Sequence, residues 1–295
     1  MGGDADIFET RRPFLTGLAY RILGSFAEAE DAVQDTWLKW RSAEHGAVSD
    51  PAAWLTTACT RRCIDMLRSA RRTRIDYVGA WLPEPIQTMT EETPESVVEL
   101  SASLSLAFLL MLERLAPKER AAFLLREIFD QSYEDVAATL GVREAACRKL
   151  VSRARSRVGR AEPGATVPKE RQDELLSAFQ TAVMTGMTTE LAALMAEDIE
   201  LRADGGGKAP TLLMPLFGKT DVLNFLGEAL HGYWQGYRWQ PADINGNRGA
   251  LVFDGANIAA SVSLACDARG SLKGVYIMRN PDKLARLGDA EKTLQ

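Results

Sequence analysis

Apolar residues recur at helical spacing through the first quarter of the chain, beginning with positions 14, 18 and 22. A Gly-Ser pair interrupts this pattern, and Ser25 has the capping-box partner Glu28 three positions later. Pro51 follows an aspartate, as an N-cap and a first-turn proline do at the start of a helix. We therefore predict an all-helical segment over residues 7–72.

Prolines separate the next segments. Residues 75–96 contain Trp81-Leu82-Pro83-Glu84-Pro85, which cannot be helical because each proline biases the residue before it away from the helical region. Helical periodicity resumes at Val97, and a second break falls at residues 163–168. The sequence thus predicts a first helical domain over residues 1–74, a linker over 75–96, a second helical domain over 97–162 and a short linker over 163–168.

The remaining residues, 169–295, combine helical stretches with short alternating or β-rich segments. Helices are expected at about residues 172–185 and 219–230. Strands are expected at residues 199–202, 248–253, 258–265 and 275–278. This mixture indicates a third, compact α+β domain.

Ser132 to Arg157 has the pattern helix, short turn with glycine, helix, which is typical of a helix-turn-helix. Gly141 permits the sharp turn, and the second helix is strongly basic. Early residues of a recognition helix meet base edges in the major groove, and later ones meet phosphates. The expected base-edge residues are Arg143, Ala145, Ala146, Arg148 and Lys149, and the expected phosphate contacts are Arg153, Arg155 and Arg157. A solvated basic face, or a helix for another partner, is the alternative.

A second basic cluster follows Pro51 on the predicted third helix. Its members are Trp54, Arg61, Arg62, Arg68, Arg71 and Arg72. An aromatic ring beside arginines suits a surface that holds melted DNA strands, because bases stack on rings and phosphates pair with arginines. A charged surface with a core tryptophan is the alternative.

The two clusters, in this order, resemble those of the sigma factors of bacterial RNA polymerase. Residues 29–40 look like the helix that binds core polymerase, residues 50–74 like the segment that melts and reads the −10 element, and residues 115–157 like the domain that reads the −35 element. The resemblance implies promoter DNA and core RNA polymerase, through its β′ coiled coil and β flap, as partners. It assigns polymerase binding to Asp31, Val33, Gln34, Asp35, Trp37 and Leu38.

Nothing between residues 73 and 96 resembles the additional domain of housekeeping sigma factors, so the chain is similar to the compact extracytoplasmic function group. Three strings are similar to marks of a subgroup with a fused SnoaL-like domain, a cone-shaped α+β fold. They are Trp81, Leu82, Pro83, Glu84 and Pro85; Asp204, Gly205, Gly206, Gly207 and Lys208; and Asn280, Pro281, Asp282, Lys283 and Leu284. The resemblance implies regulation in cis, with no separate anti-sigma factor required. We expect the first string to dock near the other two.

Bulk properties narrow the class of protein further. The net charge of −5 leaves nucleic-acid binding to local basic clusters. Four cysteines form no disulfide framework, and no histidine lies near Cys59 and Cys63 to complete a metal site. Because the N-terminal residues include acids and lack an apolar run, we expect no signal peptide. We expect a cytoplasmic protein with no metal and no cofactor.

Two alternatives to a sigma factor assign the chain to another class of protein. A ligand-responsive helix-turn-helix regulator would not bind core polymerase, and residues 29–40 argue against it. An enzyme is the second alternative, since SnoaL-like folds include enzymes with an acid in their cavity. Its candidate acid–base residues are Asp198, Asp204, Asp221 and His231, but no paired spacing supports them and we expect no catalytic residue. The C-terminal domain could also bind a small ligand.

Overall fold

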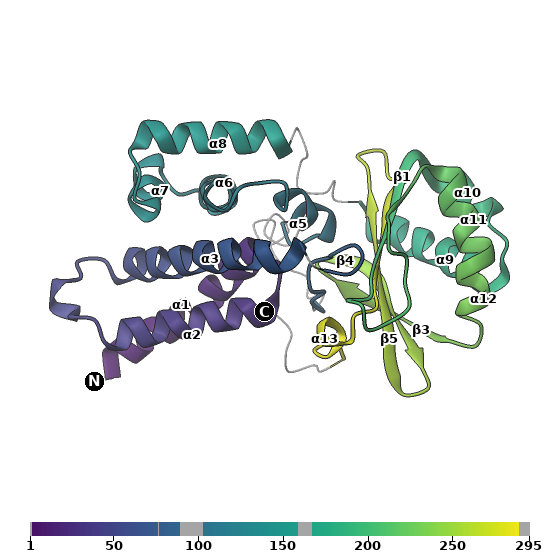
Figure 1. Cartoon of the computed structure of the whole chain (residues 1–295), viewed down its shortest axis with the longest axis horizontal. Coiled ribbons are helices and arrows are strands. Elements are labelled where there is room, and N and C mark those ends of the chain that lie inside the picture. The colour runs from purple at the N-terminus through teal and green to yellow at the C-terminus, as the bar shows by residue number, and fades with distance from the viewer. Residues whose placement is uncertain (1, 76, 89–102, 159–166, 289–295) are drawn as a thin grey trace. The chain divides into compact units, whose positions relative to one another are not determined.

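The computed structural model describes residues 2–75, 77–88, 103–158 and 167–288 (Figure 1). These residues form two compact units. The helical unit consists of residues 2–75 and 109–158, and the sheet unit consists of residues 77–88, 103–108 and 167–288. Helix α5 (Leu106–Leu112) carries the chain from the sheet unit back into the helical unit. Residues 77–88 of the predicted linker and residues 103–108 of the predicted second helical domain lie in the sheet unit.

The first half of the helical unit contains α1 (Gly2–Leu23), α2 (Phe26–Arg41), the short η1 (His45–Ala47) and α3 (Pro51–Ile75). Ser25 caps α2 as predicted, with its side chain accepting a hydrogen bond from the Glu28 amide. The apolar faces of the three long helices form one core that includes Leu18, Val33 and Leu55, each at most 1% exposed. The helical prediction for residues 7–72 is confirmed.

The second half contains α6 (Pro117–Phe123), η2 (Leu124–Ile128), α7 (Tyr133–Leu140) and α8 (Glu144–Val158). Helix α7 ends at Gly141, whose φ of 61° lies in the left-handed region. Arg120 of α6 is 2% exposed, and its Nη1 donates to the Ile22 carbonyl (2.7 Å) and to Glu113 (2.8 Å). This buried arginine ties α6 to the end of α1.

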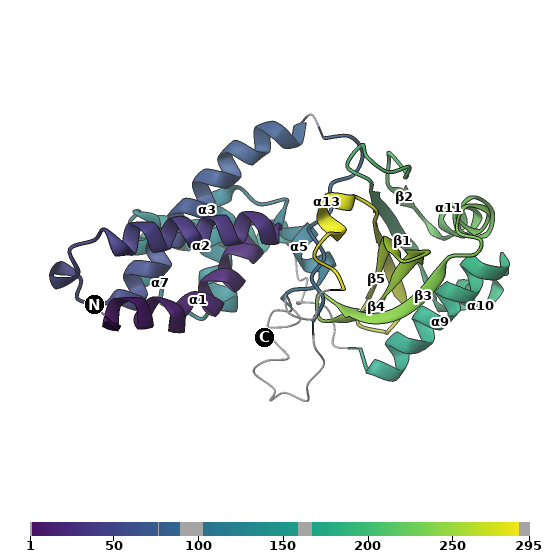
Figure 2. The same cartoon turned by 90° about the horizontal axis from the view of Figure 1, so that it is seen from below.

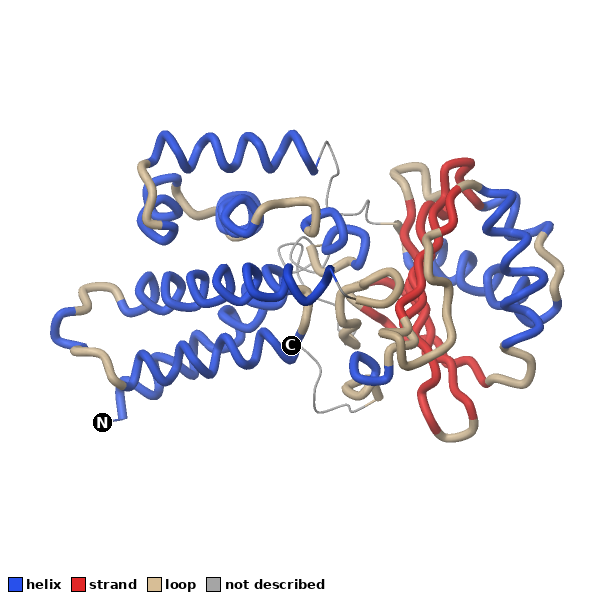
Figure 3. The backbone as a smooth tube through the Cα atoms, viewed as in Figure 1, coloured by secondary structure: helices blue, strands red, loops and turns tan. Residues whose placement is uncertain are grey.

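The sheet unit is built on six strands in the order β2-β1-β6-β5-β4-β3. Their bounds are β1 (Met195–Asp204), β2 (Leu216–Phe217), β3 (Arg238–Ile244), β4 (Asn247–Asp254), β5 (Asn257–Cys266) and β6 (Leu272–Met278). Only β1 and β6 pair in parallel. The sheet appears in red in Figure 3.

Helices cover one face of this sheet (Figures 1 and 2). They are α9 (Lys169–Thr185), α10 (Thr189–Leu194), α11 (Lys219–Asn224), η3 (Phe225–Leu230) and α12 (His231–Tyr233). Helix α13 (Pro281–Leu284) lies on the other side of the sheet (Figure 2). Apolar residues of α9 and η3 pack on alternate residues of the strands to form the core. The α+β prediction for residues 169–295 is confirmed.

Strand β3 was not predicted from the sequence, and the residues of this strand explain why. Pro241 stands in the middle of this strand, and a proline normally argues against a strand because it has no amide to donate. β3 is the last strand of the sheet, and the contacts of its outer edge to linker residues 87 and 88 involve Asp243 and Ile244, beyond Pro241. An edge position tolerates the missing donor.

Candidate nucleic-acid interface and linker clamp

One face of α2 is exposed and carries three of the residues assigned to polymerase binding. Asp31, Gln34 and Leu38 follow one another at helical spacing, and the Leu38 side chain is 46% exposed. An exposed leucine beside polar groups suits a protein partner. Trp37 is half-buried, with its ring 4.9 Å from the ring of Phe8.

Val33 does not belong to this exposed face. It is 1% exposed and packs in the core of the first three helices. A partner cannot reach it in this structure, and the assignment of Val33 to polymerase binding stays a prediction. The Val33 side chain packs α2 against α1 and α3.

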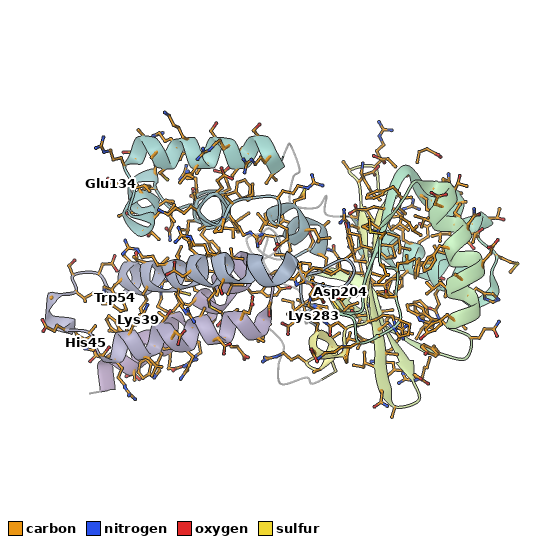
Figure 4. All side chains as sticks on the ribbon, viewed as in Figure 1. Lys39, His45, Trp54, Glu134, Asp204 and Lys283 are labelled. Carbon is orange, nitrogen blue, oxygen red and sulfur yellow. The ribbon has the colours of Figure 1, made fainter. Side chains whose placement is uncertain are left out.

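The basic cluster of α3 is only partly free. Arg62 pairs with Asp35 of α2 at 2.6 Å, and Arg68 pairs with Asp65 at 3.2 Å. Trp54 is half-buried with its ring 5.3 Å from that of Trp40 (Figure 4). Arg71 and Arg72 belong to the last turns of α3, but their side chains lie outside the described residues.

Arg61 contacts the helix-turn-helix. Its Nε donates to the carbonyl of Thr139 (2.9 Å) and its Nη2 to the carbonyl of Ala138 (3.1 Å), both in the last turn of α7. A cation at the C-terminal end of a helix is favoured by the exposed carbonyls and the helix dipole. Thr57 of α3 adds a hydrogen bond to Thr139 at 3.2 Å. Arg61, which was predicted to bind the −10 element, is thus already hydrogen-bonded to α7.

The basic residues of α8 differ in whether their side chains are already paired within the chain. Arg148 pairs with Glu144, and its guanidinium lies 4.2 Å from the Tyr133 ring centroid. Arg155 makes a forked pair with Glu127. In the described part of the chain, the exposed side chains of Arg143 and Lys149 have no hydrogen-bond or ion-pair partner. These two are the most available for DNA.

Glu119 of α6 holds the end of α8. Its side chain is 4% exposed, and it pairs with Arg157 at 2.6 Å and Arg153 at 3.2 Å. A buried carboxylate needs such partners to offset its loss of hydration. Arg153 and Arg157 therefore stabilise the packing of α8 on α6, a role that the sequence analysis did not foresee. Ala145 and Ala146 are exposed, as a groove-facing surface requires.

In the sheet unit, Asp204 is the centre of a cluster that holds the linker. Its carboxylate is 0% exposed. It accepts hydrogen bonds from Tyr77 Oη (2.6 Å), the Leu82 amide (2.9 Å), the Gly206 amide (3.0 Å) and Lys283 Nζ (2.8 Å). We call this cluster the linker clamp (Figure 4). It joins all three of the strings that the sequence analysis singled out.

Lys283 contributes more than its charge to the clamp. Its Nζ also donates to the Leu82 carbonyl (2.6 Å) and lies 4.4 Å from the centroid of the Trp81 ring. A cation over an aromatic face is stabilised by the negative face of the ring. Trp81 is thereby fixed by the C-terminal string.

Tyr77 completes the clamp from the linker side. Burial, followed by the hydrogen bond to Asp204, raises the pKa of this phenol well above its ordinary value. It stays protonated at neutral pH and keeps donating to the carboxylate. Asn280 Nδ2 in turn donates to Tyr77 Oη (2.9 Å).

Two of the three glycines, Gly206 and Gly207, lie so close to other segments that they leave no room for a side chain. Gly206 has a φ of 59°, and a Cβ there would collide with the Asn280 side chain. Gly207 has a φ of 70°, and its added Cβ would press on Val78 at 3.3 Å. The Gly206 amide already binds the carboxylate of Asp204. Any side chain at these positions would push the linker or the C-terminal string away.

Asn245 holds the linker at a second point that the sequence analysis missed. It is 1% exposed, its Oδ1 accepts from the Ile86 amide (3.1 Å) and its Nδ2 donates to the Leu104 carbonyl (3.0 Å). It stands with Gly246 between β3 and β4, both at positive φ. An Asn-Gly pair is the strongest short-range signal for such a hairpin, so this turn could have been found.

We expect loss of the Asn245 side chain to loosen the linker. Asn245→Gly keeps the backbone conformation but removes two buried hydrogen bonds, and it should lower the free energy of unfolding by about 1–3 kcal/mol. Asn245→Ala should cost about 1 kcal/mol more, because alanine is strained at positive φ. Urea denaturation measures both. Asn257→Ala, at an exposed position, is the control; an equal loss in the control and the two variants would contradict this role.

Comparison with known protein families identifies the helical segments. Residues 7–73 match the family model for sigma-70 region 2, and residues 105–158 match the model for sigma-70 region 4. The two matches occur in the order that the basic clusters predicted. The fold and these matches define an alternative sigma factor, and the chain belongs to the extracytoplasmic function (ECF) family of RNA polymerase sigma factors.

Relatives of known name agree with this assignment. The chain is 36% identical over 287 residues to the ECF RNA polymerase sigma factor SigJ of Mycobacterium tuberculosis, covering 94% of this chain and 91% of SigJ. It is 32% identical over 250 residues to the probable ECF sigma factor SigI of the same species, covering 76% of this chain and 85% of SigI. The crystal structure of SigJ superposes with a TM-score of 0.72 at 33% identity and covers 95% of this chain and 98% of SigJ.

The relative of known structure therefore includes a counterpart of the C-terminal sheet domain. The prediction of two helical sigma regions followed by a fused α+β domain is confirmed. Within the described residues, no helix is long and apolar enough to cross a membrane.

Proposed function

We propose that this chain binds core RNA polymerase, directs initiation at promoters with −10 and −35 elements, and is regulated in cis by its sheet unit. Membership of the ECF sigma factors carries the first part of the proposal. The exposed Asp31, Gln34 and Leu38 supply a surface for the polymerase. Arg143 and Lys149 supply free cations for promoter DNA.

The linker clamp carries the proposal of regulation in cis. The linker connects the two sigma regions in the sequence, and in this structure its residues 77–88 are held by β1, by the β3–β4 turn and by α13. A clamped linker has fewer conformations than a free one, so it restricts the arrangements that the two promoter-reading regions can take. Any event that opens the clamp changes the population of arrangements that can engage a promoter.

The test is in vitro transcription with core polymerase and a promoter library, using the full chain. Lys283→Gln removes a cation that binds both Asp204 and the Leu82 carbonyl. We expect it to change promoter-specific transcript yield by about tenfold, the equivalent of roughly 1.4 kcal/mol in the clamp equilibrium. Lys208→Gln is the matched control, since Lys208 makes only an exposed pair with Asp282.

The results separate the parts of the proposal. Transcripts from the wild-type chain that do not change with Lys283→Gln would refute regulation through the clamp and leave the sigma activity standing. An absence of transcripts and of binding to core polymerase would refute the role of α2. Loss of polymerase binding in Leu38→Asp, with binding retained in Glu30→Gln, would support the exposed face of α2 as the contact.

A further inference from the structure

A pocket opens in the sheet unit between the strands and the helices that cover them. It encloses about 210 Å³. Its floor comes from Ala203 of β1 and Ile277 of β6, and its walls come from Phe225 of η3, Trp234 after α12, and Arg279 after β6. The lining is mostly apolar, so the pocket suits a small apolar body.

Two residues of this lining carry buried N–H groups without a partner. Trp234 is 2% exposed, and its Nε1 has no hydrogen-bond partner among the described residues. The Nε of Arg279 is buried and is likewise unpaired there. Buried donors are nearly always hydrogen-bonded, and an unmet one costs free energy. Both atoms are closed to solvent in this structure, so an acceptor from outside the chain reaches them only after neighbouring side chains move.

The charge of Arg279 specifies the kind of acceptor. Its Nη1 donates to the Pro210 carbonyl (2.7 Å) and its guanidinium lies 4.7 Å from the Tyr233 ring centroid. In the described part of the chain it forms no ion pair, and the pocket lining contains no aspartate or glutamate. Arg279 is half-buried, and a guanidinium that has no counter-ion beside an apolar pocket favours an anion such as a carboxylate.

We propose that this pocket binds a small aromatic carboxylate, with the ring against the apolar lining and the carboxylate accepting from Arg279 and, once neighbouring side chains move, from Trp234. The volume of the pocket agrees with a small aromatic carboxylate, since an apolar cavity of about 150 Å³ holds benzene. The larger volume here leaves room for a short substituent that bears the carboxylate. The pocket lining includes none of the candidate acid–base residues of an enzyme, which are Asp198, Asp204, Asp221 and His231.

Backbone hydrogen bonds connect the lining of the pocket to the linker clamp. The amides of Arg279 and Asn280 both donate to the Asp204 carbonyl, at 2.7 and 2.9 Å. Ala203 of the pocket floor immediately precedes Asp204. A ligand on Arg279 therefore acts on the residues next to the clamp. This regulatory consequence rests on the proposed function, whereas the binding itself does not.

The test is calorimetric titration of the full chain with 3-phenylpropionate, and with its neutral amide as the matched probe. We expect the carboxylate to bind at least about tenfold more tightly than the amide, because a charge-assisted hydrogen bond is worth more than a neutral one. Arg279→Met should weaken carboxylate binding by about tenfold to a hundredfold. Arg238→Met is the control, since Arg238 stacks on Phe253 at 3.9 Å and does not line the pocket.

Trp234→Phe provides a second variant that keeps an aromatic ring and removes only an unpaired N–H and part of the indole. It should fold and should bind the carboxylate more weakly. Equal affinity for the two probes, no binding at millimolar concentration, or unchanged affinity in Trp234→Phe would overturn the proposal. Because titration needs no polymerase, its failure beside a transcription change in Lys283→Gln would refute the pocket alone. Binding without any effect of Lys283→Gln would refute the regulation alone.

Discussion

Replacing Asp204 with asparagine is expected to lower the free energy of unfolding of the sheet unit by about 3–5 kcal/mol, the cost of breaking a buried ion pair from one side. The Asp204 side chain is 0% exposed and that of Lys283 is 13% exposed, so neither group can turn to water while the clamp is closed. The neutral amide leaves the Lys283 ammonium without its counter-ion. It also presents an NH₂ group to donors that need an acceptor. Urea denaturation of the full chain, followed by tryptophan fluorescence, measures the loss.

Asp282→Asn is the matched control for this variant. Asp282 is also an acid paired with a lysine, but its side chain is 63% exposed and that of its partner Lys208 is 56% exposed. Exposed pairs contribute about 0–1 kcal/mol. Hydrogen exchange at the Leu82 amide provides a local readout, because this amide donates directly to Asp204. Equal stability losses in the two variants, or unchanged exchange at Leu82 in Asp204→Asn, would contradict the central place of Asp204.

Replacing Arg143 or Lys149 with alanine is expected to weaken promoter binding by about 1–3 kcal/mol each when the residue contacts a base edge. Both side chains are exposed on α8 and have no partner among the described residues, so no intramolecular pair has to break before DNA binds. Binding of the chain with core polymerase to a labelled promoter fragment, at stated salt, measures the change. The salt dependence separates a base contact from a phosphate contact, because loss of a phosphate contact lowers the salt slope by about one.

Arg155→Gln is the control on the same helix. Its guanidinium is held by two hydrogen-bonded contacts to Glu127 and is less free to bind DNA. We expect its effect on promoter affinity to be smaller than that of Arg143→Ala. A larger effect in Arg155→Gln would mean that DNA displaces Glu127 from Arg155. The absence of an intramolecular partner would then be the wrong criterion for choosing the DNA-binding residues of α8.

The helical half of the fold was predictable because local signals agree with packing there. Ser25 caps α2, Pro51 opens α3 and Gly141 ends α7, each where its backbone preference indicated. Periodicity alone could not show which side of α2 faces the core, so Val33 was placed on the partner surface. A helix with apolar residues on more than one side has no single buried face until its neighbours are known.

The linker clamp was predictable only in part. The three strings were recognised from their resemblance to a subgroup. Tyr77 carried no local signal, because its partners Asp204 and Asn280 are 127 and 203 residues away. Asn245 carried a hairpin signal with Gly246, but Pro241 obscured the strand before it. Buried polar contacts between distant segments depend on the tertiary fold, and periodicity does not report them.

The sequence separation within the linker clamp has a consequence for synthesis on the ribosome. Tyr77 and Asn280 are 203 residues apart, so at about 5–20 residues per second their synthesis is separated by roughly 10–40 seconds. During this interval both sigma regions have been translated, while Leu82 and Ile86, buried in the finished chain, lack the partners that cover them. The nascent chain thus passes through a stage in which both sigma regions exist without the linker clamp. The clamp can close only after Lys283 of α13 has been synthesised.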